Sequence, residues 1–570
     1  MATASSSAGF DEVFDAVVVG SGAAGLAAAL TAAIGGLSVL VVEKADTIGG
    51  STAISGGAVW VPGHSHLGAV GLTESRAAVI DYLRAHLGNR LRVDMIEAFL
   101  DRGPEMIDFL ERHTALRLAP RAVSPDYKPD LPGAAAGGRT LDPVVYDGRE
   151  LGRDFGRLRA PLKEFLVFGG MMVNRKDIDT LLSATKSVQA FLGSAALVLR
   201  FARDRLSQKR GTRLLMGNAL AARLFRSALD RAIPIRERHA ARDLIVEDGR
   251  VVGLVVEGPS GPRRIGARRG VVLASGGFPG SAAMRQALLP HADRHYSMAP
   301  SGNGGDGIRL AQGVGGRIGT DNVGNAFWAP VSVMREADGT ETRFPHLILD
   351  RAKPGLVAVD GTGRRFVNEA NSYHDFVEAM HLAQETRPAI PAWLVCDAAF
   401  IRRYGLGLVR PGLRPLGRFL KSGYLVRGDT VETLARAMAV DPAALADTVA
   451  RMNRYAETGT DPDFGKGSTA YNRYLGDAAH KPNPCLGPIR TAPYYAVRVW
   501  PGDIGTAAGL ETDPRARVLG ADGQPIPGLW ACGNDMNSIM AGTYPSAGIT
   551  LGPALTFGYI AGLDLASATP

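Results

Sequence analysis

A glycine-rich turn between two apolar segments near the N-terminus places the strongest constraint on the fold. Residues 14–19 (FDAVVV) are apolar and rich in β-branched side chains, which predicts a buried strand. The sequence GSGAAG (20–25) follows, then an alanine-rich helix to about Ile34 and a second strand at 37–42 that ends at Glu43. This order predicts a βαβ unit, and therefore an α/β protein with a Rossmann-like dinucleotide-binding domain.

Each part of this unit has a physical reason in a dinucleotide site. Gly20 permits the tight turn, Gly22 lets the backbone approach a pyrophosphate, and Gly25 lets the helix pack closely on the strand. The helix N-terminus attracts phosphates, and the carboxylate of Glu43 can accept hydrogen bonds from a ribose. An ordinary glycine-rich turn is the alternative, and the complete context makes it the weaker interpretation.

Two further segments favour FAD over a nicotinamide cofactor. GGSTAISGG (49–57) resembles the flavoprotein segment that runs along the diphosphate, and ACGND (531–535) resembles the one that contacts the ribityl chain. GVG (313–315) follows a predicted helix, so we interpret it as a helix end and expect no second nucleotide domain. No histidine lies within 49–57 for covalent attachment, so we expect non-covalent FAD. The predicted cofactor-binding residues are Gly20, Gly22, Ala23, Ala24, Gly25, Glu43, Lys44, Gly50, Ser51, Thr52, Ser55, Gly56, Gly57, Ala274, Gly276, Asp306, Gly533, Asn534, Asp535, Gly548, Ile549 and Leu551.

Composition excludes several other classes of protein. The net charge of +8 over 570 residues suits an anionic cofactor or membrane surface, and no basic tract with interleaved aromatics indicates nucleic acid. The three cysteines form no CxxC pair, and the HxH pair at 64–66 has no third ligand nearby, so we expect no metal site. The N-terminus has no signal-peptide pattern, which together with the few cysteines leads us to expect a cytoplasmic location.

The pattern along the chain predicts two domains. We expect the FAD-binding domain at 14–295, with a helical insertion at 161–231, and its return segment at 486–570. A substrate domain with α+β character is expected at 296–485. Within these limits we predict helices at 74–113, 374–386 and 430–456, a long loop at 119–160, and a hairpin that turns at Asp248-Gly249.

Five motifs extend the resemblance over nearly the whole chain. GGSTAISGG (49–57), GVVLASGGF (270–278), GNGGDGI (302–308), GRRFVNEA (363–370) and GLWACG (528–533) resemble the fumarate reductase/3-ketosteroid dehydrogenase superfamily. Fumarate reductases carry a proton-donating arginine at a position that corresponds to Pro545 here. TYPSAG (543–548) is instead similar to the TYP motif of the 3-ketosteroid Δ1-dehydrogenases, as are residues 363–380 and the loop 126–133.

This resemblance implies 1,2-dehydrogenation of a 3-ketosteroid in steroid breakdown, with four catalytic groups. The Tyr544 hydroxyl and the Gly548 N–H would polarise the C3 carbonyl, and Tyr373 would take the C2 proton. Tyr127 would stabilise the Tyr373 phenolate, and flavin N5 would take the C1 hydride. A quinone-like electron acceptor, not identified by the sequence, would reoxidise the flavin. For any single tyrosine the alternative is a core aromatic, but three fall in matching contexts.

Two other functions remain open alternatives. One is a fumarate-reductase-like enoate reductase or dehydrogenase for a different substrate, and the other is a flavin-binding protein without turnover. Ser546 and Ile549 depart from the glycine run of the family, and Gly542 stands where the family carries a histidine. These departures are expected to reshape the pocket beside the flavin.

Residues 188–226 combine apolar and basic side chains and have two interpretations. A peripheral membrane contact would use the apolar residues for insertion and the basic ones for anionic lipid. A helical hairpin that covers the core with a solvated basic face is the alternative, which the sequence slightly favours. The basic residues are Arg200, Arg203, Arg205, Lys209, Arg210, Arg213, Arg223 and Arg226.

Overall fold

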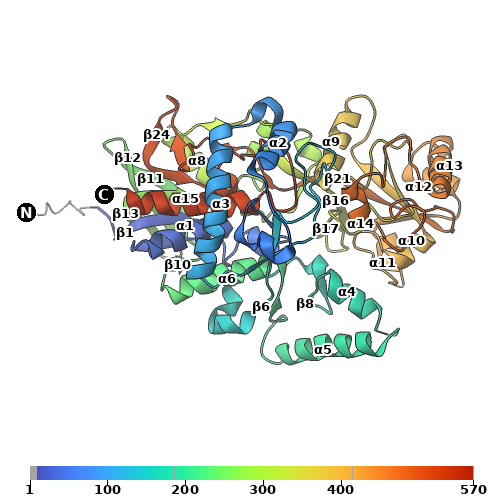
Figure 1. The fold of residues 1–570 in the computed structure, drawn as a ribbon, viewed down its shortest axis with the longest axis horizontal. Coiled ribbons are helices and arrows are strands. Elements are labelled where there is room, and N and C mark those ends of the chain that lie inside the picture. Colours follow the sequence, from blue (N-terminus) through green and yellow to red (C-terminus); the bar gives the residue numbers. More distant parts are fainter. Residues whose placement is uncertain (1–8, 185, 414, 569–570) are drawn as a thin grey trace, which may run out of the picture.

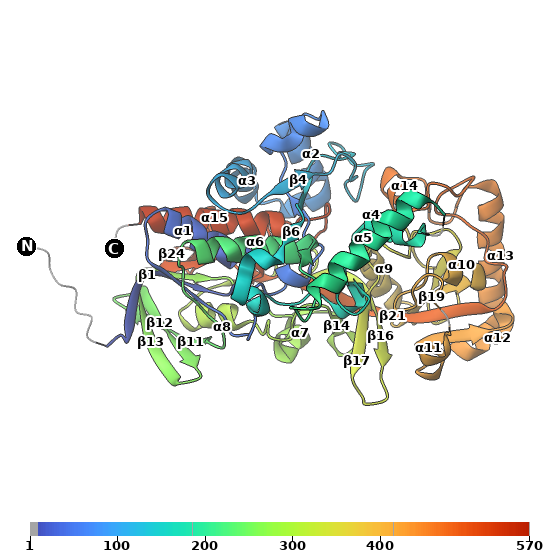
Figure 2. The ribbon, with the colours of Figure 1, turned by 90° about the horizontal axis from the view of Figure 1, so that it is seen from below.

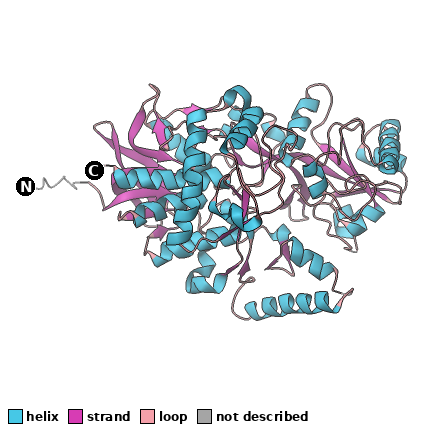
Figure 3. Ribbon diagram, in the orientation of Figure 1, coloured by secondary structure: helices cyan, strands magenta, loops and turns pink. Residues whose placement is uncertain are grey.

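Two β-sheets side by side form the frame of the protein. The computed structural model describes residues 9–184, 186–413 and 415–568. Figures 1 and 2 show the first sheet at the end that holds both termini and the second sheet at the far end. Figure 3 shows helices packed around both sheets. The predicted α/β class is confirmed.

The first sheet has eight strands, and the predicted N-terminal unit lies at its centre. Its main path runs β10-β2-β1-β13-β12-β11, and β24 joins β13 while β23 joins β24. β1 lies between β2 and β13, parallel to both, with Val18 opposite Val41 and Val272. The strands are β1 (Glu12–Val19), β2 (Val39–Val42), β10 (Ile235–Arg236), β11 (Ala240–Glu247), β12 (Arg250–Gly258), β13 (Gly261–Leu273), β23 (Arg517–Leu519) and β24 (Pro525–Ala531).

Long helices from both ends of the chain pack together beside this sheet. α1 (Ala23–Ile34) is buried along nearly its whole length because its alanines let neighbouring backbones come close. α15 (Leu551–Ser567) runs against α1, and α3 (Val93–His113) lies beside α15 (Figure 1). α6 (Met216–Asp230) also packs on α1. The C-terminal segment is thereby held against the predicted nucleotide turn.

The second sheet is built from strands that follow in the chain. Its path is β17-β16-β21-β19-β18, and β14 and β20 also pair with β21. The strands are β14 (Tyr296–Ser297), β16 (Ala326–Arg335), β17 (Glu341–Pro345), β18 (Leu356–Val359), β19 (Ala392–Asp397), β20 (Leu425–Gly428) and β21 (Tyr494–Thr506). β21 therefore lies in this sheet, although the sequence assigned residues from 486 onward to the FAD-binding part. The division into domains at 295 and 485 stays a prediction.

The structure confirms one prediction about an individual element and corrects two others. The hairpin is confirmed, since β11 and β12 pair as antiparallel strands and both turn residues have positive φ. The predicted loop at 119–160 is wrong in part, because β5 (Thr140–Pro143) pairs with β3 (Val59–Trp60) and β4 (Leu118–Pro120). The helix predicted at 430–456 is two helices, α12 (Val431–Met438) and α13 (Pro442–Thr458), since the proline at position 442 starts a new helix.

The helical insertion includes one helix that lies apart from both sheets. α4 (Arg175–Leu182) and α5 (Val188–Asp204) lie at the lower edge of the molecule in Figure 1. α5 exposes apolar side chains at helical spacing, including Phe191, Leu192 and Leu199, each about two-thirds exposed. No helix among the described residues is long and apolar enough to cross a membrane.

Candidate active site

The glycine-rich turn after β1 leaves room for a ligand at one position only. Gly20 has φ +107°, and a Cβ there would lie 2.2 Å from the carbonyl oxygen of Ala274. A Cβ on Gly25 would lie 2.1 Å from the carbonyl oxygen of Gly20. A Cβ on Gly22 would meet nothing closer than the Thr52 hydroxyl oxygen at 3.7 Å. The free space therefore lies in front of Gly22, at the N-terminus of α1, where a pyrophosphate fits.

Hydrogen bonds join this turn to the next two predicted segments. The carboxylate of Glu43 accepts from the Ser21 backbone N–H at 3.0 Å and from the Ser21 hydroxyl at 2.7 Å. The Ser21 hydroxyl oxygen accepts from Gly49 N–H, and the Thr52 hydroxyl oxygen accepts from Ala23 N–H at 3.0 Å. The first turn, the acidic residue and the 49–57 segment thus form one surface.

Other predicted cofactor residues bind one another across the fold. Lys44 forms an ion pair with Asp306 at the start of α8 (Asp306–Gly313). The buried carboxylate of Asp535 accepts from the backbone N–H groups of Ser275 and Gly277, so it fixes the turn after β13. Asn303, which no sequence argument singled out, donates to Ser51 and to the Gly276 carbonyl. Cofactor contact by these residues stays a prediction.

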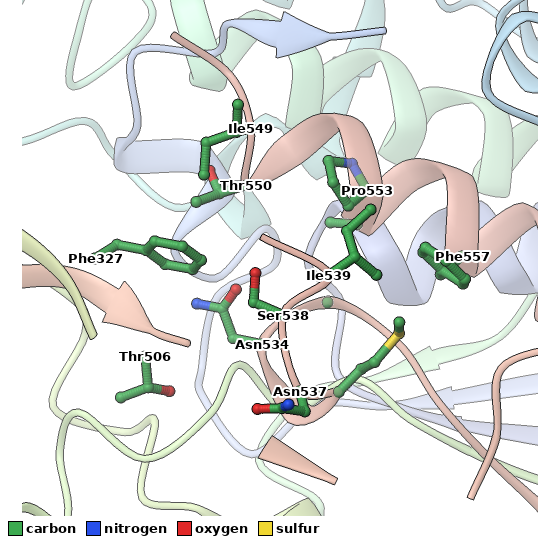
Figure 4. A pocket seen from close by; sticks show the side chains of 13 residues that line it. Phe327, Thr506, Asn534, Asn537, Ser538, Ile539, Ile549, Thr550, Pro553 and Phe557 are labelled. Carbon is green, nitrogen blue, oxygen red and sulfur yellow. The ribbon is translucent and has the colours of Figure 1, made fainter. Parts of the chain in front are cut away.

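A pocket beside the C-terminal segment connects these loops to the start of α15 (Figure 4). Its lining combines apolar side chains with amide and hydroxyl groups. Three predicted residues, Gly533, Asn534 and Ile549, are among the lining residues. The remaining lining residues are Phe327, Thr506, Met536, Asn537, Ser538, Ile539, Thr550, Pro553, Ala554 and Phe557.

Three of the predicted catalytic residues form one aromatic cluster. The hydroxyl oxygens of Tyr127 and Tyr373 are 3.2 Å apart. The ring of Tyr544 lies 5.5 Å from that of Tyr127 and 5.2 Å from that of Tyr373. Phe327, which lines the pocket, has its ring 5.7 Å from that of Tyr544. The cluster therefore adjoins the pocket, although its members are far apart in the sequence.

Local structure explains how each tyrosine reaches the cluster. Tyr373 is the first residue of α9 (Tyr373–Gln384), and the side chain of Ser372 caps that helix. The Tyr127 backbone N–H donates to the carbonyl oxygen of Pro545 at 2.9 Å, which ties its loop to the residue after Tyr544. The hydroxyl of Tyr82 donates to the same carbonyl at 2.6 Å.

Burial controls the protonation of the cluster. Loss of solvent raises the pKa of Tyr373 and of Tyr127 well above the usual value of a tyrosine. It raises the pKa of Tyr544 to about 12. All three are therefore neutral phenols near pH 7, able to donate hydrogen bonds. A phenolate on Tyr373 therefore forms only where neighbouring groups stabilise its negative charge.

A fourth tyrosine belongs to the cluster, and sequence reasoning missed it. Tyr471, on α14 (Ala470–Leu475), is buried with its ring 4.6 Å from that of Tyr127. Its short helix carries no motif that would have indicated it. Only the packing of α14 behind the loop of Tyr127 brings this hydroxyl near the others.

The backbone around Gly548 provides a hydrogen-bond donor. Gly548 has φ +97°, and a Cβ there would lie 2.7 Å from Trp60 N. Its carbonyl accepts from Trp60 N–H at 3.1 Å, but within the described residues its own buried N–H donates to no acceptor. A substrate oxygen is the group that such an unpaired donor suits.

The departure at Gly542 has a packing reason. Gly542 has φ +74°, and a Cβ there would lie 1.7 Å from the carbonyl oxygen of Gly324. The loop before β16 therefore occupies the space that a side chain would take. Ile549, the other departure near the pocket, lines it directly.

Comparison with known proteins identifies the class. The family described as FAD binding domain matches residues 15–551. The chain is 38% identical to a 3-oxosteroid 1-dehydrogenase of Mycolicibacterium smegmatis, over 97% of both chains. It is 42% identical to a 4-oxocyclohex-2-ene-1-carboxylate 5-dehydrogenase of Sinomonas cyclohexanicum, over 97% of this chain and 93% of that one. A solved 3-ketosteroid Δ1-dehydrogenase of Sterolibacterium denitrificans superposes with a TM-score of 0.91 at 38% identity, covering 98% of this chain and 100% of that one.

These matches place the protein among the FAD-dependent oxidoreductases. The chain belongs to the FAD binding domain family and, within it, to the family of the 3-ketosteroid Δ1-dehydrogenases. FAD is its cofactor. The free space before Gly22, at the N-terminus of α1, fits the diphosphate of that dinucleotide.

The open space at Gly22 makes a test of the cofactor site possible. We predict that Gly22→Ala weakens FAD binding about tenfold or more, because the methyl group blocks a charge-assisted hydrogen bond worth roughly 1.5–3 kcal/mol. The stability of the apoprotein should change by less than about 0.5 kcal/mol, since the new Cβ meets no close neighbour. Flavin fluorescence titration and thermal unfolding measure the two effects.

Gly25→Ala is the matched control. Its Cβ would collide with the protein itself, so apoprotein stability and FAD binding should fall together. Unchanged FAD affinity in Gly22→Ala would exclude this turn as the phosphate site.

Proposed function

We propose that the protein is an FAD-dependent 3-oxosteroid 1-dehydrogenase. The observation that carries the proposal is the cluster of the Tyr127, Tyr373 and Tyr544 side chains, together with an unpaired backbone N–H at Gly548, four residues after Tyr544. The 3-oxosteroid 1-dehydrogenases among the relatives support it. The reaction removes two hydrogens from neighbouring carbons, one of which is next to a ring ketone.

In this proposal the residues of the chain divide the work at the ketone. The neutral Tyr544 hydroxyl and the Gly548 N–H donate to the carbonyl oxygen, where negative charge develops as the α-proton leaves. Tyr373 takes that proton, and the Tyr127 hydroxyl donates to the Tyr373 oxygen at the same time. FAD, when bound, supplies the two-electron oxidation by accepting the hydrogen of the β-carbon with its electron pair.

A second substrate class has a specific observation in its favour. The relative that acts on 4-oxocyclohex-2-ene-1-carboxylate is 42% identical, and a 4-oxocyclohexanecarboxylate 2-dehydrogenase of the same organism is 36% identical. By their names, all these relatives dehydrogenate a six-membered ring that carries a ketone. The same tyrosine cluster would serve either substrate, so a small oxocyclohexanecarboxylate is the second candidate.

The last part of the proposal concerns the electron acceptor and the surface of the protein that would contact a membrane. We propose that a quinone-like acceptor reoxidises the enzyme and that α5 contacts an anionic membrane, where a steroid and a quinone would both dissolve. Val188, Phe191, Leu192, Val198 and Leu199 are exposed on α5. This apolar set is supported by basic residues that are exposed at the end of α5 or just beyond it, namely Arg203, Arg205 and Lys209.

Substrate bleaching tests the function directly. Under anaerobic conditions, 4-androstene-3,17-dione should bleach the flavin absorbance of the holoenzyme within a single turnover, and ubiquinone-1 should restore it. Bleaching by 4-oxocyclohexanecarboxylate alone would select the second candidate. Absence of bleaching by both compounds would contradict the dehydrogenase function.

The pH dependence tests the role of Tyr373. Because burial raises its pKa, the phenolate fraction is small at neutral pH and grows about tenfold with each step of one pH unit below that pKa. We therefore predict that kcat/KM rises with pH above 7. Tyr373→Phe should lose at least about 100-fold in kcat together with this rise, while FAD stays bound. A variant that keeps its pH dependence would transfer the role to another group.

Vesicle binding tests the membrane contact. Vesicles of phosphatidylcholine with phosphatidylglycerol should pellet the holoenzyme, and vesicles of phosphatidylcholine alone should bind it more weakly. Leu199→Glu should reduce binding about tenfold or more, since a charge then enters the apolar face. Val246→Glu, a change at an exposed apolar residue of β11, is the control. Equal binding of both variants would contradict the assignment of α5.

A further inference from the structure

A buried arginine without a carboxylate partner lies behind the segment that carries Tyr373. Arg351 is 2% exposed, and its guanidinium donates to the carbonyl oxygens of His346 at 2.7 Å and Leu347 at 2.9 Å. It also donates to the carbonyl oxygens of Glu369 at 2.8 Å and Asn371 at 3.1 Å. No ion pair joins this guanidinium to a carboxylate among the described residues. Such burial is costly, which calls for a reason.

Two carboxylates that act on Arg351, those of Asp350 and Glu369, bind other partners. Asp350 accepts from His346 Nδ1 at 2.7 Å and from the Arg351 backbone N–H, not from the guanidinium. Glu369 pairs with Arg365 and with Lys466. The guanidinium therefore forms hydrogen bonds with neutral groups only, while the carboxylates of Asp350, Glu369 and Asp375 act on its charge from a distance.

The contacts of Arg351 fix the backbone immediately before Tyr373. Two of its acceptors are carbonyls of the segment 369–371, and its guanidinium lies over the ring of Phe376, one turn into α9, at 5.1 Å. The side chain of Asn371 accepts from Asn472, the neighbour of Tyr471, at 3.1 Å. Arg351 thereby contacts α9 directly through Phe376 and is linked to α14 through one residue, Asn371.

The charge of Arg351 also acts on the tyrosine cluster. It lowers the pKa of Tyr471, against the larger effect of burial, and Tyr471 packs on Tyr127, whose hydroxyl meets that of Tyr373. The charged and titratable groups around the cluster include Arg121, which favours a phenolate on Tyr127, and Asp375, which disfavours one on Tyr471. His374, paired with Glu378, also faces the cluster, with its ring 5.6 Å from that of Tyr544. Burial raises the pKa of Asp375 itself.

We propose that Arg351 is a positioning residue of the dehydrogenation, which holds the Tyr373 segment by its carbonyls and stabilises the negative charge of the tyrosine cluster when Tyr373 accepts the proton. This inference rests on the proposed function for the role of that proton. The planar guanidinium explains how four carbonyls are bound at once, and the missing carboxylate partner leaves its charge available to the phenolate.

A substrate-independent titration tests the electrostatic part. Trifluorotyrosine incorporated at position 373 has a more acidic phenol than tyrosine, and its fluorine NMR signal reports ionisation in the holoenzyme. Arg351→Gln should raise this pKa by about 1 or more, because a nearby cation favours the charged phenolate. In Arg351→Lys, which keeps the positive charge, the pKa at position 373 should lie close to its value in the protein that keeps Arg351. The exposed Arg402→Gln is the control for charge in general.

Kinetics tests the catalytic part with the substrate that bleaches the flavin. In Arg351→Gln the rise of kcat/KM with pH should move to higher pH by as much as the pKa at position 373 rises. At pH 7, kcat/KM should then be about tenfold lower if that pKa rises by about 1. Arg351→Lys should recover the pH dependence even where kcat remains reduced. A loss of activity with an unchanged pH profile would mean a structural role only and would overturn the proposal.

A second variant keeps the test valid if Arg351→Gln does not fold. Arg351→Lys keeps the cation but cannot bind four carbonyls, so in this variant the pKa at position 373 should stay close to its value in the protein with Arg351 while kcat falls. A pKa raised by about 1 or more in Arg351→Lys would overturn the inference. Because the titration needs no substrate, a raised pKa without flavin bleaching would reject the proposed function and retain the effect of Arg351.

Discussion

The close backbone packing of α15 against the N-terminal unit is the constraint on which the site depends. A Cβ on Gly552 would lie 1.9 Å from the carbonyl oxygen of Trp60, and one on Gly558 would lie 2.4 Å from that of Ala24. These glycines let the last helix touch β3 and α1 with no side chain between them. The loop with Tyr544 and Gly548, just before this helix, is therefore held at a fixed distance from the nucleotide turn.

The loop that carries Tyr127 is attached to the C-terminal loop through one backbone carbonyl. Pro545 O accepts from the Tyr127 backbone and from the Tyr82 hydroxyl, so the loop 126–133 and the first part of the chain follow the C-terminal loop. Tyr373 comes from the other side, on a helix that packs against β16. The tyrosine cluster is thus formed where the helix of one sheet meets the loops of the other. Relative motion of the two sheets would separate Tyr544 from Tyr373.

Sequence reasoning predicted the parts that local chemistry determines. The βαβ unit, the hairpin and the motif positions of three tyrosines follow from short patterns, and these tyrosines do come together. Tyr471 and Arg351 escaped prediction because their partners are backbone carbonyls and rings distant in the chain, which leave no pattern. The basic cluster at 200–226 was also misjudged in part, since Arg213 pairs with Asp177 and Arg223 binds carbonyls inside the fold.

Under the proposed function, the tyrosine cluster would recognise a ring ketone and little else, which would explain why relatives with different substrates share this architecture. The three tyrosine hydroxyls and the Gly548 N–H would surround one carbonyl and its α-carbon, an arrangement that suits a cyclohexanone ring whether or not further rings follow. Discrimination must then come from residues beyond the cluster, where an unpaired charge or an overfilled space rejects one substrate. This chain differs from the family at two such places. Ile549 lines the pocket, and the loop at Gly324 packs against Gly542, where the family carries a histidine. Under the proposed function, specificity and chemistry would therefore occupy separate residues, so that either could change while the other is retained.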